Sequence, residues 1–212
     1  MQSNNTISTK RKNLLLRVQK GHYATSHSHI SHFIDVTMQK SRLSEAKAIA
    51  EEILSYYQTT TIIDTILCLD GMQVVGTCLA DALTSNNFMN LNAHQTIYVI
   101  TPEYTAGSQI IFRDNLSHAI TGKNVLILAA SVVTGYTAKS AIEAITYYGG
   151  RVAGISSIFA TQDSFMGYDV VSAFNPNDIP GYDSYAPHEC PMCRRGERIQ
   201  GLVNSFGFSK LL

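Results

Sequence analysis

Short apolar runs alternate with longer amphipathic stretches from about residue 41 to residue 175. In the amphipathic stretches the apolar residues recur at helical spacing, whereas the short runs are rich in β-branched and aliphatic residues typical of buried strands. The pattern predicts helices over 43–57, 74–83 and 138–148, and strands over 61–69, 96–100, 125–128 and 151–159. Alternation of this kind is typical of βαβ units. The sequence therefore predicts an α/β fold with a parallel sheet flanked by helices.

Two predicted loops should meet at one edge of that sheet. Asp70-Gly71-Met72-Gln73 follows the first predicted strand, and residues 129–137 follow the third. Ligands of open parallel sheets bind beyond the carboxyl ends of the strands, so both loops are expected at one site. Residues 102–112 follow the second strand and contain Thr105-Ala106-Gly107-Ser108, which suits a mobile loop or hairpin tip that closes over that site.

Composition narrows the class of protein. A chain of 212 residues with 45% hydrophobic and 15% charged residues fits one globular domain with elaborations. Its 16 basic and 16 acidic residues cancel, which argues against a nucleic-acid or membrane-surface binder that relies on net charge. No apolar stretch approaches the ~18 residues of a membrane span, and the N-terminus lacks an apolar signal segment. We expect a cytoplasmic protein, with its four cysteines reduced.

The end of the third predicted strand has the composition of a phosphate cradle. Val125 to Leu128 is a buried-strand run, and Thr134-Gly135-Tyr136-Thr137 then offers hydroxyls and backbone N–H groups where a helix begins. Anions are favoured at helix N-termini. An ordinary strand-to-helix loop explains the spacing equally well.

The order of residues in this segment resembles the phosphate-binding signature of the type I phosphoribosyltransferases. In that family a buried strand ends in two acidic residues and continues into Thr-Thr-Gly-x-Thr or a close variant. Thr134, Gly135 and Thr137 match the second half, whereas Ala129 and Ala130 stand where the two acids are expected. The resemblance covers roughly residues 20 to 175.

Within the family, the chain most resembles the orotate phosphoribosyltransferase group. The similarity rests on the segment 28–35, which is like the hood that precedes the first helix there, and on the helix-Gly-Gly-strand passage 138–159. The element Cys190-Pro191-Met192-Cys193 also occurs in some members. The resemblance implies one domain made of a flexible tail (1–12), the hood (13–40), the core (41–175) and a C-terminal Cys-Pro-x-Cys extension (176–212).

The resemblance also implies a function and a site. It implies transfer of a phosphoribosyl group from phosphoribosyl pyrophosphate, with Mg²⁺, to a nitrogenous base in nucleotide synthesis or salvage, by a homodimer. The implied pyrophosphate loop is Asp70, Gly71 and Met72. The implied 5′-phosphate site is Ser131, Val132, Val133, Thr134, Gly135, Tyr136 and Thr137.

Three departures bear on catalysis. Ala129 and Ala130 cannot accept hydrogen bonds from ribose hydroxyls, and each such charge-assisted bond is worth about 1.5–3 kcal/mol. The loop 102–112 carries Glu103 as its only charge, and the nearest cation is Arg113. The turn 160–163 contains no arginine that would hold an orotate carboxylate. The alternatives are a catalytically impaired regulatory protein that binds a phosphoribosyl compound or nucleotide, and a different transfer in which Asp70 or a hood histidine replaces the carboxylates.

Histidines and cysteines form two further groups. His22, His27, His29 and His32 crowd the hood, where they suit a metal or phosphate site, proton transfer, or simply an exposed polar loop.

Near the C-terminus, His188, Cys190 and Cys193 have the spacing of three zinc ligands but lack a fourth. An inert turn with two reduced thiols is favoured over zinc or a redox pair, although a hood histidine would complete a site. The basic residues Lys10, Arg11, Lys12, Arg17 and Lys20 are interpreted as a solvated arm rather than a phosphate contact.

Overall fold

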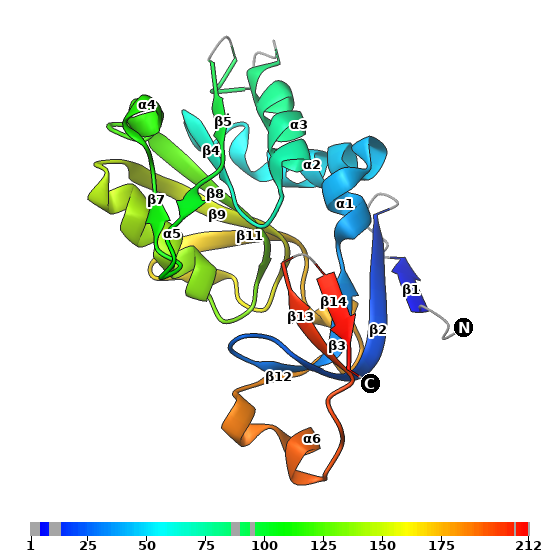
Figure 1. The fold of residues 1–212 in the computed structure, drawn as a ribbon. Coiled ribbons are helices and arrows are strands. Elements are labelled where there is room, and N and C mark those ends of the chain that lie inside the picture. Colours follow the sequence, from blue (N-terminus) through cyan, green and yellow to red (C-terminus); the bar gives the residue numbers. More distant parts are fainter. Residues whose placement is uncertain (1–4, 9–13, 86–89, 94–95, 206, 212) are drawn as a thin grey trace.

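A computed structural model describes residues 5–8, 14–85, 90–93, 96–205 and 207–211. Two six-stranded sheets dominate it, and Figure 1 shows them in separate parts of the molecule. The core sheet has the order β10-β11-β9-β8-β4-β5, in which all neighbours are parallel except β10 and β11. Its strands are β4 (Thr65–Cys68), β5 (Tyr98–Ile100), β8 (Asn124–Val132), β9 (Arg151–Ala160), β10 (Ser164–Phe165) and β11 (Tyr168–Phe174).

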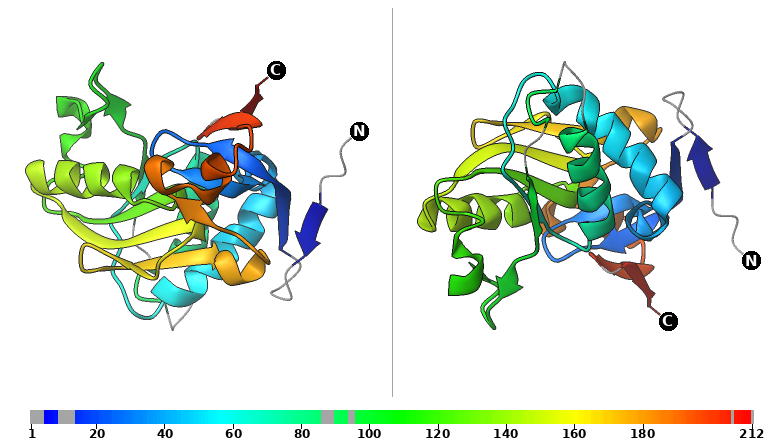
Figure 2. Two further views of the ribbon diagram at one scale, coloured as in Figure 1. Left: turned by 90° about the horizontal axis from the view of Figure 1, so that it is seen from below. Right: turned by 90° about the horizontal axis from the view of Figure 1, so that it is seen from above.

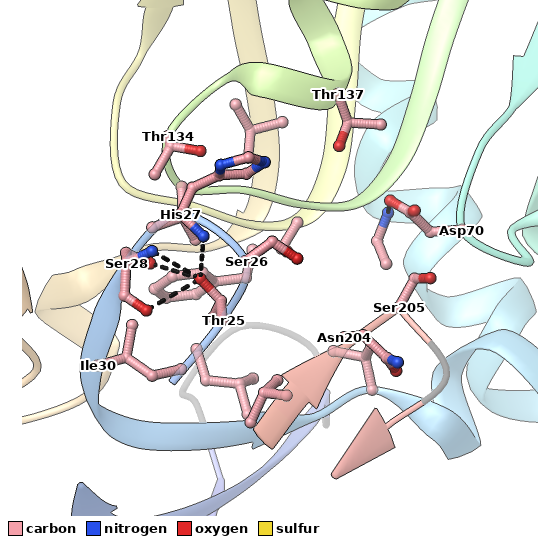
Figure 3. A pocket seen from close by; sticks show the side chains of 18 of the residues that line it. Thr25, Ser26, His27, Ser28, Ile30, Asp70, Thr134, Thr137, Asn204 and Ser205 are labelled. Atoms are coloured by element: carbon pink, nitrogen blue, oxygen red, sulfur yellow. Dashed lines mark hydrogen bonds between the residues drawn. The ribbon is translucent and has the colours of Figure 1, made fainter. Parts of the chain in front are cut away.

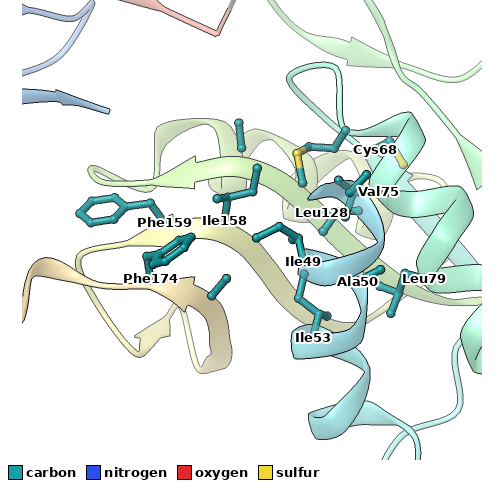
Figure 4. Close-up of a cluster of buried hydrophobic side chains, with 14 of the residues drawn as sticks. Ile49, Ala50, Ile53, Cys68, Val75, Leu79, Leu128, Ile158, Phe159 and Phe174 are labelled. Atoms are coloured by element: carbon teal, nitrogen blue, oxygen red, sulfur yellow. The ribbon is translucent and has the colours of Figure 1, made fainter. Parts of the chain in front are cut away.

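Helices cover both faces of the core sheet (Figure 2). On one face, α2 (Leu43–Tyr57) and α3 (Gln73–Thr84) bury their apolar stripes against β4, β8 and β9, as the cluster in Figure 4 shows. On the other face, α5 (Tyr136–Tyr147) packs on alternate residues of the same strands. Burial on both faces explains why residues 125–130 of β8 are all apolar and do not alternate with polar ones. The expected α/β fold with a parallel sheet is confirmed.

Several predicted boundaries were wrong for local reasons. β4 begins at Thr65, not at residue 61, because the Ile63 backbone N–H donates to the Asn92 side chain (2.8 Å) and does not enter the ladder. β8 continues to Val132, four residues beyond its predicted end, because Val132 still pairs with Ala160 on β9. The parallel strand β11 was not predicted.

The α5 helix ends as its sequence predicts. Gly149 has a φ of +75° and its N–H donates to Thr146 O, while Gly150 N–H donates to Ile145 O. This is the left-handed glycine cap expected from Gly149-Gly150. The segment 102–112 forms the expected hairpin, β6 (Glu103–Tyr104) with β7 (Ile110–Ile111). It leads to the one-turn helix α4 (Asp114–Ser117).

The second sheet, here called the hood sheet, joins both ends of the chain. It has the order β12-β3-β2-β13-β14, and β1 also pairs with β2. Its strands are β1 (Asn5–Ser8), β2 (Leu15–Ala24), β3 (His29–Asp35), β12 (Ser184–Tyr185), β13 (Gly201–Asn204) and β14 (Gly207–Lys210). The C-terminal hairpin β13–β14 was not predicted, and β13 lies parallel to β2 although the two are far apart in sequence.

The remaining elements are short; the first two lie on connections between the two sheets, and the last two lie between β12 and β13 of the hood sheet. They are α1 (Thr37–Ser41), 3₁₀ turns at Pro176–Asp178 and Pro187–Glu189, and α6 (Pro191–Arg194). Of the predicted flexible tail, residues 5–8 form β1, and the rest, with Lys10, Arg11 and Lys12, lies outside the described residues. Within the described part of the chain, every helix is too short or too polar to cross a bilayer.

Candidate functional site

A cavity of about 320 Å³ lies between the hood sheet and the carboxyl ends of the core strands. Its walls come from the β2–β3 turn and β3, from the end of α1, from Asp70, from residues 130–138 and from the C-terminal hairpin. Figure 3 shows the hood turn Thr25–Ser28 at one end, near Thr134, and Asp70 with Ser205 at the other. The two loops predicted to converge therefore do contribute to one cavity.

The α5 helix begins directly on this cavity. Gly135 is its N-cap, with a φ of +75°, and a Cβ there would lie 2.2 Å from the Phe165 ring. The first N–H groups of a helix have no partner within the helix, so they face the cavity as donors together with the exposed hydroxyls of Thr134 and Thr137. Thr161 holds this turn by donating its hydroxyl to Val133 O (2.9 Å). The arrangement suits an anion.

All seven residues predicted for the 5′-phosphate site line the cavity, from Ser131 to Thr137. Their local structure differs from the expected loop, because Ser131 and Val132 belong to β8. The two alanines before them point to opposite faces of that strand. Ala130 lines the cavity, whereas Ala129 is 1% exposed and packs in the cluster beneath α5. An acid at position 129 of this structure would be buried among apolar side chains.

Asp70 is the residue of the predicted pyrophosphate loop that reaches the cavity. It has a φ of +53°, and its carboxylate accepts from the Ala130 backbone N–H (3.4 Å). Burial raises the pKa of this carboxyl, and the Ala130 N–H and nearby Lys40 oppose that shift. Gly71 and Met72 do not line the cavity; Met72 is 0% exposed in the core, where it anchors the start of α3.

Lys40 is a candidate site residue that the sequence reasoning missed. It lies near the end of α1, and its ammonium donates to Asp70 O (2.8 Å) and to Ser205 O (2.7 Å). Burial lowers the pKa of this amine, and Asp70 and Asp35 oppose the shift. Lys40 and Asp35 both line the cavity, so a cation and two carboxylates surround one space. Nothing in the local sequence distinguishes Lys40 from a surface lysine at the end of a helix.

The four hood histidines have different surroundings. His27 lies on the β2–β3 turn, lines the cavity and stacks on Tyr136 with ring centroids 4.1 Å apart. His32 is buried and hydrogen-bonds the Ser31 hydroxyl (2.8 Å). His22 and His29 lie outside the cavity lining, close to Cys190 and Cys193. His188, a predicted zinc ligand, is exposed beside Glu189 and is not part of that group.

The β6–β7 hairpin offers no additional free cation to the cavity within the described chain. Arg113, the cation nearest to it in sequence, donates to both carboxylate oxygens of Glu103, and the Nε–Oε2 distance is 2.7 Å. Burial raises the pKa of the Tyr104 phenol on β6, and the negative charge of Asp70 raises it further. The hairpin itself thus carries no cation, and the arginine that follows it is paired with Glu103.

Comparisons with known proteins agree with this arrangement, although no family model matches the chain. The orotate phosphoribosyltransferase of Sulfurimonas denitrificans is 32% identical over 89 residues, and the match covers 35% of this chain and 43% of that enzyme. The structure of Leishmania donovani UMP synthase matches with a TM-score of 0.54 and 18% identity, over 76% of this chain and 34% of the other. An adenine phosphoribosyltransferase of Trypanosoma brucei, solved with AMP, pyrophosphate and ribose-5-phosphate, matches with a TM-score of 0.51 and 12% identity, over 76% and 78% of the two chains.

The chain has the type I phosphoribosyltransferase fold. Its resemblance to orotate phosphoribosyltransferase, drawn from residues 28–35, from the passage 138–159 and from the Cys-Pro-x-Cys element, is confirmed by the curated relative. The chain spans less than half the length of that relative and about a third of the UMP synthase. Within the phosphoribosyltransferase fold, the cavity lies where the β8–α5 turn, Asp70 and the hood sheet meet.

Proposed function

We propose that the protein is a phosphoribosyltransferase that moves a phosphoribosyl group from phosphoribosyl pyrophosphate to a nitrogenous base in nucleotide synthesis or salvage, with pyrimidines as the first bases to test. One observation supports this most strongly: the N-terminus of α5 and the Asp70 carboxylate face the same cavity under the hood sheet. Phosphoribosyl pyrophosphate carries a phosphate at one end and a pyrophosphate at the other, so its site needs one region for each of these groups.

The 5′-phosphate is proposed to bind at the β8–α5 turn. The N–H groups after Gly135 and the hydroxyls of Thr134 and Thr137 supply donors on one side of the cavity. These donors are held in place before binding, because Thr161 and the Phe165 contact fix the turn. Such preorganised donors stabilise an anion without reorganisation.

The pyrophosphate and Mg²⁺ are proposed to bind towards Asp70. The carboxylates of Asp70 and Asp35 are oxygen ligands of the kind that Mg²⁺ prefers, and Lys40 is a fixed cation beside them. When bound, Mg²⁺ would neutralise charge on the leaving pyrophosphate. Lys40 would thereby supply, from α1, positive charge that the β6–β7 hairpin does not carry.

The base is proposed to bind between the hood and the core. Ile30, Phe33, Phe159 and Tyr182 give this part of the cavity an apolar wall suited to a planar ring. The Tyr182 hydroxyl is buried and has no hydrogen-bond partner among the described residues, so it is available to a polar edge of the ring. The Trypanosoma brucei enzyme was solved with a nucleotide, pyrophosphate and ribose-5-phosphate, and ligands of the same classes are proposed here.

The second candidate function is a regulatory protein that binds the same compounds without turnover. Ala130, lining the cavity, and the buried Ala129 favour it, because neither can hold the ribose hydroxyls. Asp70 argues for retained catalysis. Its carboxylate accepts from the Ala130 N–H, so an acid lies next to the position where Ala130 replaces one of the two expected acids. The two functions share a binding site and differ in chemistry.

Calorimetric titration with phosphoribosyl pyrophosphate and Mg²⁺, followed by a pyrophosphate-release assay across free bases, separates the two functions. Binding with turnover supports the transferase, and binding without turnover on any base supports the regulatory protein. Absence of binding contradicts both. The double variant Thr134→Ala, Thr137→Ala should bind more weakly by about 100-fold or more, because it loses two hydroxyl donors to a charged group, each worth about 1.5–3 kcal/mol. Ser140→Ala, which removes an exposed hydroxyl one turn further along α5, is the matched control and should bind normally.

The expected homodimer and cytoplasmic location belong to the same proposal. Light scattering of the purified chain tests the first, since a dimer should give twice the monomer mass of 23.3 kDa. A mass equal to one chain at the concentrations used for binding would remove the dimer from the proposal.

A further inference from the structure

Four metal-ligating side chains converge on the outer part of the hood, away from the cavity lining. His22 lies on β2, His29 begins β3, and Cys190 and Cys193 flank the start of α6. One ligand atom from each lies within 4.8 Å of the others. Cys190 and Cys193 are free thiols, and Figure 1 shows α6 beyond β12 at the end of the hood sheet.

The distances within this group match those of a tetrahedral centre. His22 Nε2 lies 3.2 Å from His29 Nδ1, 3.6 Å from Cys190 Sγ and 3.7 Å from Cys193 Sγ, and Cys193 Sγ lies 3.2 Å from His29 Nδ1. A tetrahedral ion with bonds of about 2.0 Å to nitrogen and 2.3 Å to sulfur separates its ligands by roughly 3.3–3.8 Å. The four atoms are thus spaced as ligands around one small ion.

A backbone contact orients one of the ligands. His22 Nδ1 lies 2.9 Å from Glu197 O, and a carbonyl can only accept, so Nδ1 carries the proton. In the neutral ring the lone pair is then on Nε2, the atom that faces His29 and both cysteines. A metal-ligating histidine is typically oriented by such a second hydrogen bond.

We propose that His22, His29, Cys190 and Cys193 bind one zinc ion in a structural site. Two imidazoles and two thiolates in tetrahedral spacing favour zinc among the common divalent metals. Four protein ligands leave no position open for substrate, so the site is structural and not catalytic. The favoured interpretation of Cys190 and Cys193 as an inert turn is replaced, because the fold supplies two histidines that the local spacing lacks. This proposal does not depend on the proposed transferase function.

The site would tie the C-terminal extension to the hood. His22 and His29 flank the β2–β3 turn, whose residues 25–28 line the cavity, and the cysteines follow about 160 residues later in the chain. Zinc would therefore fix the base of this turn and close a long loop of chain. Because the four ligands come together only on folding, the free energy of zinc binding would add to the stability of the folded state.

Zinc content of the full chain, purified without a histidine tag, tests the proposal. Elemental analysis should find about one zinc per chain. Cobalt added to the metal-free protein should give the visible absorption of a tetrahedral ion and a near-ultraviolet thiolate band. Cys193→Ser, chosen because Cys193 is exposed, should lose both signals. Cys78→Ser and His188→Ala, which alter a cysteine and a histidine outside the group, should keep them.

Measurements on the unaltered chain keep the test independent of whether a variant folds. The proposal is overturned if folded wild-type protein, checked by circular dichroism, neither contains zinc nor gives the cobalt spectrum. Retention of full zinc by Cys193→Ser would also overturn it, as would a Cys190–Cys193 disulfide in protein purified anaerobically. If Cys193→Ser loses zinc but still binds phosphoribosyl pyrophosphate as the wild type does, the metal site is supported independently of the proposed function.

Discussion

Both the backbone conformation and the space around position 135 require a glycine there. Its φ of +75° lies in the left-handed region, which disfavours side chains, and the Phe165 ring occupies the place of a Cβ. The aromatic ring thereby holds the turn that starts α5. The sequence analysis predicted that Gly135 belongs to the turn before α5, but it did not predict the contact with Phe165 on β10.

Gly135→Ala should lower the free energy of unfolding by about 2–4 kcal/mol, the sum of left-handed strain and overpacking. Gly122→Ala is the matched control, because Gly122 has a φ of +72° with no atom near the added Cβ. It should cost about 1 kcal/mol from backbone strain alone. Urea denaturation measures both variants, and equal losses would show that Phe165 moves away at no cost.

Asp70 combines a strained backbone with a carboxyl whose folded-state pKa is raised by burial. Protonation therefore favours the folded state. The carboxyl contributes most to stability below its unfolded pKa, and that contribution is lost as the pH rises through the folded pKa. At neutral pH the ionised group lowers stability, which is common where a charge serves binding.

Asp70→Asn should therefore unfold at a higher temperature than the wild type at pH 7. Asparagine tolerates a positive φ, and its amide oxygen can still accept from Ala130 N–H. The gain should shrink as the pH falls towards about 4, where the wild-type carboxyl also takes up a proton. Calorimetric scans across this pH range provide the measurement. A variant that is less stable than the wild type at pH 7 would contradict the argument, whereas weaker binding of Mg²⁺ with the donor is expected.

At the scale of elements, one ion pair joins the hood sheet to the helical layer. Arg17 on β2 donates to both carboxylate oxygens of Glu45 on α2, at 2.7 and 2.9 Å. Their side chains are 21% and 16% exposed, so solvent screens the pair only partly. The hydrogen bond from Arg17 holds the pKa of Glu45 below its usual range. This places Arg17 in a fixed contact and not in the solvated arm predicted for it.

Glu45→Gln should destabilise the protein by about 1 kcal/mol at pH 7, near the upper end for such pairs because the geometry is bidentate. The lowered pKa means that the wild-type advantage is present above the unfolded pKa and is lost as the pH falls through the folded one. Glu143→Gln, which breaks the exposed Lys139–Glu143 pair, is the control and should change little. Denaturant midpoints at pH 7 and in acid report both effects; a difference independent of pH would contradict the assigned cause.

The elements themselves were predictable to different degrees. α2, α3 and α5 follow from their apolar spacing, because each buries one stripe on the sheet. Strands were harder to delimit, because their ends depend on partners: β8 extends through Ala129 and Ala130 only because β9 continues beside it. The β13–β14 hairpin was missed because its pairing with β2 joins the two ends of the chain.

At the scale of the whole molecule, the cavity is shared by parts of the chain that meet only on folding. The hood turn 25–28, the β8–α5 turn and the C-terminal segment 203–205 all line it. Lys40 connects the last of these regions to the loop after β4, since it donates to Ser205 O and to Asp70 O. A ligand in the cavity contacts the hood and the core together and should stabilise both.

Phosphoribosyl pyrophosphate with Mg²⁺ should therefore slow amide hydrogen exchange in all three regions at once. The segment 56–61 lies outside the cavity lining and is the internal control, where exchange should not change. Hydrogen-exchange mass spectrometry provides the measurement. Slower exchange at the start of α5 alone would indicate an anion bound at that helix without the hood, and would contradict a cavity that acts as one site.

Local sequence determined the α/β class, the three long helices, and the turn of small and hydroxyl residues before α5, since periodicity and turn chemistry act between near neighbours. Tertiary structure alone decided the rest. It placed Asp70 against Ala130, brought Lys40 from α1 into the cavity, and set His22 and His29 beside Cys190 and Cys193. These contacts join residues 30 to about 170 positions apart, and no local pattern encodes which distant side chains the packing of two sheets will bring together.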